Sequence, residues 1–184
     1  NPAAASGAAS AVAAADPEAA SQVATAMAQA APEAAAAVAA GVASGVARAA
    51  IAEVNQETAQ ANAVIQTDAQ SQTANAQAGF ADAVTDAQAN IGSSDAGAAS
   101  DAQDTISDAQ GELAEIRSDT QDLLLESNQA GQEAALEASQ EATAEIIAEM
   151  IALNPDAAAE IIAGTAASNP EAAAEIVQEM MESN

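Results

Sequence analysis

Carboxylates are the only side chains in this sequence that are numerous enough to do chemistry. The chain has 28 Asp and Glu residues against two basic residues, Arg48 and Arg117, and its formal net charge is −26. Between residues 101 and 126 the acids recur every three or four positions, which places them along one side of a helix. The row begins with Asp101, Asp104, Asp108, Glu112, Glu115 and Asp119.

This acidic row predicts a solvated helix face with weak, diffuse affinity for cations. No loop has the alternating oxygen ligands and final bidentate Glu of a calcium site, and the ligands of structural zinc are absent. We therefore expect neither a discrete metal site nor a cofactor. Divalent cations or high salt would serve to screen the repulsion between carboxylates.

The side chains that most often act in catalysis are absent from this sequence. The chain contains no His, Cys, Tyr or Trp, both of its basic residues are Arg, and Phe80 is its only aromatic residue. Most general bases and nucleophiles are thus missing. Paired carboxylates could in principle hydrolyse glycosides, but such a site also needs a concave core and sugar-binding aromatic residues. We predict that the protein is not an enzyme.

The charge also excludes two classes of partner. Nucleic acids and anionic membranes are bound by Lys and Arg, of which this chain has almost none. The apolar residues 34–43 fall short of the roughly 20 residues that span a bilayer, and Gly41 and Gly45 interrupt the region. We expect no nucleic-acid binding and no membrane insertion.

Prolines divide both ends of the chain into units of fifteen residues. Pro2, Pro17 and Pro32 are evenly spaced, as are Pro155 and Pro170, and the stretch beginning at Gln140 fits the same pattern. Proline is favoured at the first position of a helix, and it disfavours helical geometry in the residue before it. The sequence predicts three short helices at each end, in residues 1–47 and 140–184, stacked as in an α-solenoid.

The seventh and eleventh positions of these units carry apolar side chains that share one helix face. In phase with the repeat, the sequence ends at Asn184 and begins with Asn1-Pro2, so the last unit of one copy could be continued by the first unit of the next. We expect a head-to-tail interface of this kind, which builds open filaments when it does not close. The predicted interface residues are Val12, Val23, Met27, Val38, Val42, Ile161, Ile162, Ile176, Val177, Met180 and Met181.

Residues 48–139 predict a long antiparallel pair of Ala-rich helices with a glycine loop near residues 92–100. In the first helix Val54, Ile65, Ala76 and Ala87 are eleven residues apart, a spacing that gives a nearly straight or slightly right-handed coil. Ala61 is also among the apolar or small positions that we expect along this helix. In the second helix a heptad seam runs from Ala102 through Leu123 to Ala130 and Ala134.

The predicted protein is all-α, with short helical repeats flanking a long helical hairpin, and it partners with itself. The first residue is not Met, so we expect a secreted, processed protein outside the cell or at its surface. The predicted function is that of a subunit of an extracellular filament or surface layer. An alternative is an ice-binding or surface-hydrating protein, since the chain resembles helical antifreeze proteins in composition; a further alternative is a desiccation protein that is disordered in solution.

Overall fold

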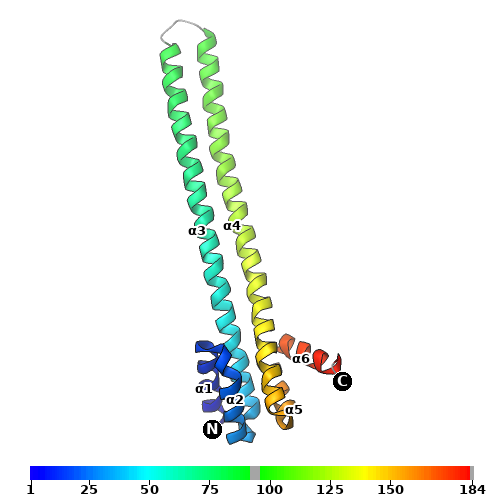
Figure 1. The fold of residues 1–184 in the computed structure, drawn as a ribbon. Helices are drawn as coiled ribbons and strands as arrows, with labels where there is room; N and C mark the ends of the chain where they lie inside the picture. Colours follow the sequence, from blue (N-terminus) through cyan, green and yellow to red (C-terminus); the bar gives the residue numbers. More distant parts are fainter. Residues whose placement is uncertain (92–95, 183–184) are drawn as a thin grey trace. The chain divides into compact units, whose positions relative to one another are not determined.

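A computed structural model describes residues 1–91 and 96–182, and every element that it contains there is helical. The all-α prediction is confirmed. In chain order the elements are α1 (Pro2–Ala15), α2 (Pro17–Ala30), the 3₁₀ turn η1 (Pro32–Ala34), α3 (Ala35–Ile91), α4 (Ala96–Leu153), the 3₁₀ turn η2 (Pro155–Ala157), α5 (Ala158–Ser168) and α6 (Pro170–Glu182) (Figure 1).

Helices begin at or just after each of the five prolines, and the residue before four of them forms a corner. Asp16 has φ −148° and ψ 87°, and Asn169 has φ −144° and ψ 85°. These are extended values, as expected before proline. At both corners the residue's N–H donates to the carbonyl four residues earlier, and its carboxylate or amide oxygen accepts an N–H of the next helix, from Ala19 at 3.1 Å and Ala172 at 3.3 Å.

Replacing the capping side chain of Asp16 should destabilise the first corner. Asp16→Ala leaves the Ala19 N–H without its partner, so we expect a loss of about 1 kcal/mol in the free energy of unfolding. Asp16→Asn keeps an acceptor oxygen and should restore most of the loss. Urea unfolding followed by circular dichroism measures both; equal stability of the Ala variant and the natural chain would contradict the capping role.

Two of the predicted boundaries fall inside helices. α3 is continuous across residues 47 and 48, and α4 is continuous across residues 139 and 140. Gln140 therefore does not begin a helix, because glutamine neither fixes its own φ nor restricts the residue before it, as proline does. Of the predicted loop near 92–100, residues 92–95 lie outside the described part, and residues 96–100 already belong to α4.

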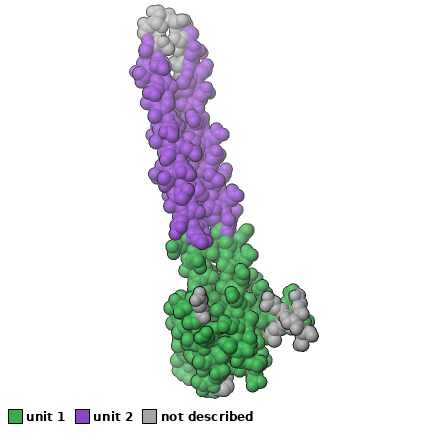
Figure 2. All heavy atoms as spheres, in the orientation of Figure 1, with its two compact units in different colours: residues 1–56, 131–184 green, residues 57–130 purple. Residues whose placement is uncertain are grey.

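The chain divides into two compact units, coloured separately in Figure 2. Unit 1 comprises residues 1–56 and 131–184, and unit 2 comprises residues 57–130. Both ends of the sequence thus belong to the same unit.

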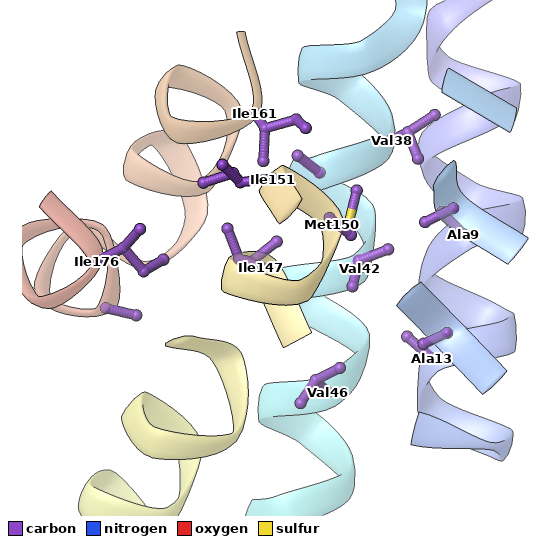
Figure 3. Close-up of a cluster of buried hydrophobic side chains, with 14 of the residues drawn as sticks. Ala9, Ala13, Val38, Val42, Val46, Ile147, Met150, Ile151, Ile161 and Ile176 are labelled. Atoms are coloured by element: carbon purple, nitrogen blue, oxygen red, sulfur yellow. The ribbon is translucent and has the colours of Figure 1, made fainter. Parts of the chain in front are cut away.

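Unit 1 has a hydrophobic core whose centre is the first part of α3. Figure 3 shows Val38, Val42 and Val46 between Ala9 and Ala13 of α1 on one side and Ile147 and Met150 of α4 on the other. Ile161 of α5 and Ile176 of α6 complete the same cluster. The N-terminal helices contribute mostly alanine to it, whereas the C-terminal helices contribute the large side chains. The two ends of the chain thus contribute side chains of different size to one core.

Glycines let the helices of unit 1 approach closely. A Cβ added to Gly41 would collide with the backbone carbonyl of Ser6, one on Gly45 would lie 2.7 Å from the Ala13 Cβ, and one on Gly164 would collide with the carbonyl of Ala36. Gly41 and Gly45 are thus contact points between α3 and α1, although the sequence presents them only as interruptions of an apolar stretch.

Unit 2 consists of the α3 and α4 segments, which lie side by side and run in opposite directions (Figure 1). Along α3 the less exposed positions repeat every eleven residues, as predicted for Ile65, Ala76 and Ala87. The third member of each repeat is Asn62, Thr73 or Val84; Ala61, which was expected to be one of these positions, is exposed.

The heptad seam predicted for α4 is wrong at Leu123, Ala130 and Ala134, which are exposed. Leu123 is 51% exposed, whereas Leu124 is half-buried, and Ala130 is exposed as well. In the described part of this segment the half-buried positions are also eleven apart, as in Leu113 with Leu124 and Ile116 with Ser127. Two helices in lengthwise contact must share one twist, so α4 follows the period of α3.

Candidate functional site

The carboxylates predicted to attract cations do not form a site. Asp101, Asp104, Asp108, Glu112, Glu115 and Asp119 are all exposed along α4. Within residues 1–91 and 96–182 no group of three or more acids is arranged to hold a metal ion. A row of exposed carboxylates on one helix can concentrate counter-ions near its surface, but it provides no cage for them.

The predicted self-assembly residues are divided between the core and the surface of unit 1. Val38, Val42, Ile161 and Ile176 are buried in the chain's own core, and Val12, Met27 and Ile162 are half-buried. Val23, Val177 and Met181 are exposed, and the side chain of Met180 lies outside the described part. Only the exposed group is available to another molecule without opening the fold.

Unit 2 contains a polar pair that the periodicity did not reveal. Asn62 of α3 donates from Nδ2 to Oδ1 of Asn128 at 3.0 Å, and Asn128 in turn donates to the Leu124 carbonyl at 2.7 Å. Asn128 is exposed, so this bond joins the two helices at a position that solvent reaches. Asn62 occupies one of the half-buried positions, so a strict search for apolar residues passes over it.

Two grooves run between the helices of unit 2. The first, here called the Arg117 groove, has a volume of about 500 Å³ and a mostly apolar lining. Its lining residues are Gln66, Ala69, Gln70, Thr73, Ala74, Gln77, Leu113, Ile116, Arg117, Thr120 and Gln121. Arg117 is the only charged residue among those that line this groove.

The second groove, here called the Phe80 groove, has a volume of about 700 Å³. Gln72, Asn75, Ala76, Gly79, Phe80 and Ala83 of α3 line one wall, and Thr105, Asp108, Ala109, Glu112 and Ile116 of α4 line the other. It therefore combines the chain's single aromatic side chain, an aliphatic side chain and two carboxylates one helical turn apart.

One helix is apolar enough to cross a membrane by length and composition alone, among the residues described. It lies within residues 35–89, and 44% of its most apolar window is buried in the protein. Our expectation that no stretch reaches this threshold needs correction, because Ala-rich sequence keeps the hydropathy high across Gly41, Gly45 and Arg48. Val38, Val42 and Val46 of this helix lie in the core of unit 1.

Known proteins give no further guide to the site. No protein family matches the chain, and neither curated proteins nor solved structures show a significant similarity to it.

Proposed function

We propose that this protein is a structural, non-catalytic subunit of an extracellular filament or surface layer. In this proposal, six helical segments of about fifteen residues form one stack, and the long antiparallel helical pair is inserted between the third and the fourth. The stack continues from one copy to the next through its end helices. The supporting observations all come from unit 1.

The observation that carries the proposal is a contact that occurs twice. Gly41 and Gly164 are both the tenth residue of their proline-initiated units, and each lies against the carbonyl of a fifth residue, Ser6 or Ala36. α3 therefore packs on α1 in the way that α5 packs on α3. A contact repeated at a constant step has no intrinsic end, which is the property that solenoids and filaments share.

The corners support the same arrangement. Besides Asp16 and Asn169, Ala31 has φ −142° and ψ 79°, and Asn154 has φ −142° and ψ 70°. The N–H groups of all four corner residues donate to a carbonyl four residues earlier, at 2.7–3.0 Å. Nearly the same backbone conformation thus occurs at all four corners, as expected of a repeated unit.

The outer face of α6 provides the surface for assembly. Val177 is 39% exposed and Met181 is 76% exposed, although both are apolar. Helices that terminate a stack in soluble repeat proteins have polar outer faces. The apolar face of α6 thus suits contact with α1 of a second copy, where Gly7 leaves open space because a Cβ added there meets nothing within 4 Å.

The net negative charge of the chain determines the ionic strength at which two copies can associate. Residues 1–56 have four acids and Arg48, and residues 131–184 have eleven acids and no base, so the net charges of these two parts are −3 and −11. Like charges repel at low ionic strength, and salt at about 0.1 M reduces the range of that repulsion to about 10 Å. Assembly should therefore require salt or divalent cations.

Electron microscopy and sedimentation at low salt, at high salt and with calcium test the proposal. We expect monomers at low salt and filaments when the charge is screened. Met181→Glu should prevent assembly, since it places a charge in the proposed interface, and Gln60→Glu adds the same charge at an exposed position of unit 2 as the control. A chain that stays monomeric in every condition, or filaments that tolerate Met181→Glu, would contradict the proposal.

The ice-binding alternative gains no support from the structure. Thr58, Thr73 and Thr120 are half-buried, while Thr67, Thr85 and Thr105 are exposed and donate to carbonyls of their own helices. We do not propose it.

A further inference from the structure

The Phe80 groove of unit 2 has the features of a docking surface. Its apolar lining includes Phe80 and Ile116, both half-buried, and its volume of about 700 Å³ is open to solvent. Among the described residues of unit 2, only Ala76 and Ala87 are buried, and each is still 8% exposed. A pair of helices with so thin a seam leaves its larger apolar side chains partly in water, and a third helix laid in the groove would cover them.

The charge around the groove determines what kind of helix fits. Asp108 and Glu112 lie one turn apart on the α4 wall, whereas the α3 wall is uncharged. Residues 57–130 contain thirteen acids and one Arg, a net charge of −12. A second copy of this unit would bring −12 against −12, whereas a helix with Lys or Arg along one edge would be attracted.

Gly79 provides an independent indication. Glycine in the interior of a helix is unfavourable relative to alanine. Gly41, Gly45 and Gly164 have a reason within the chain, because each accepts a close neighbour, but a Cβ added to Gly79, as to Gly7 or Gly111, would meet nothing within 4 Å. Gly79 nevertheless lines the Phe80 groove, where the missing side chain lets another backbone come close.

We propose that the Phe80 groove binds an amphipathic helix of a partner protein, one that carries a row of Lys or Arg beside an apolar stripe. The apolar stripe packs between Phe80 and Ile116, the basic row faces Asp108 and Glu112, and a small residue of the partner crosses Gly79. This inference concerns unit 2 and does not depend on the assembly proposed for unit 1.

The probe is a synthetic helical peptide of about 20 residues with a Leu and Ala stripe, a Lys row and one Trp. The full chain contains neither Trp nor Tyr, so the Trp emission reports on the peptide alone. A peptide of the same composition in scrambled order has the same charge but no stripe. We expect only the ordered peptide to bind with saturation, and we expect the affinity to fall as salt is added.

Gly79→Ala separates binding from stability, because the two should change in opposite directions. The variant should raise the thermal midpoint of the chain by about 2–4 °C, since alanine is the better helix former. It should also weaken peptide binding about tenfold by overfilling the contact. Gly111→Ala is the matched control: a Cβ there also meets open space, but the residue lines neither groove.

A second pair of variants tests the charge. Asp108→Asn with Glu112→Gln should weaken binding about tenfold, whereas Asp119→Asn with Asp122→Asn removes the same charge outside both grooves and should weaken it less. Equal binding of the ordered and scrambled peptides, or equal effects of Gly79→Ala and Gly111→Ala, would overturn the proposal. Dimerisation of the peptide-free chain that Gly79→Ala abolishes would also overturn it, by making a second copy the occupant.

Discussion

Gly164→Ala is expected to destabilise unit 1, although alanine is the better helix former. The added Cβ would collide with the Ala36 carbonyl oxygen and would lie only 2.8 Å from its carbon, and a backbone group cannot rotate away as a side chain can. Overfilling a packed contact costs about 1–3 kcal/mol, which exceeds the gain of up to about 1 kcal/mol in helix propensity. The net result should be a lower free energy of unfolding.

Urea unfolding followed by circular dichroism measures this loss, and hydrogen exchange locates it. Protection should fall in α5, which contains Gly164, and should be retained in unit 2. Gly7→Ala is the matched control, since its Cβ would meet nothing within 4 Å, and it should leave stability unchanged or slightly raised. A Gly164→Ala chain as stable as the natural one would show that α5 does not pack on α3 as described.

Ile147→Ala should have the largest effect of any single truncation considered for this protein. Ile147 is 0% exposed and belongs to the cluster that joins α4 to α3, α5 and α6. Removing its side chain costs the transfer free energy of the lost atoms and leaves a cavity, together about 2–5 kcal/mol. That is a large fraction of the stability of a typical domain, about 5–15 kcal/mol.

Leu136→Ala on the same helix is the control for Ile147→Ala. Leu136 is 58% exposed, so its truncation should change the free energy of unfolding by no more than about 0.5 kcal/mol. The two midpoints in urea can be compared directly if the slopes agree. Equal effects of both truncations would mean that the cluster around Ile147 is not the core of unit 1.

Local features of the fold could be predicted because they depend on neighbouring residues. A proline with Asp or Asn before it starts a helix wherever it occurs, and an eleven-residue spacing marks one helix face regardless of what covers it. Alanine is the best helix former, and the scarcity of aromatic and β-branched runs disfavours strands, so the sequence favours an all-α chain. These inferences needed no knowledge of distant contacts.

The meeting of the two ends in one core could not be predicted. Alanine faces such as those of α1 and α2 are compatible with many partners, and nothing in their pattern points to Ile147 or Ile161 more than to another copy of the chain. The sequence predicts a self-assembly interface that includes Val38, Val42, Ile161 and Ile176, and in the structure these residues belong to the core of unit 1. The same residues suit either contact, so only the three-dimensional arrangement decides between them.

The Phe80 groove was missed for a different reason. A groove between two helices is formed by residues 72–83 and 105–116, which are distant in sequence and individually ordinary. One signal was present: Gly79, a poor helix former in the middle of a long helix, stands directly before the chain's single aromatic residue. Gly111 faces open space in the same way but lines neither groove, so the pairing of Gly79 with Phe80 is what distinguishes this position.

The repeated packing of α1, α3 and α5 through Gly41 and Gly164 has a consequence for how such a chain can change its length. If alternate helices are related by the same displacement, duplicating a pair of consecutive helices presents each neighbour with a surface it already recognises. The chain could then change its length by duplication of thirty-residue segments. A single inserted fifteen-residue unit would instead place a helix beside neighbours that it does not normally contact. By the same rule, an engineered chain could be lengthened or shortened by adding or removing pairs of helices.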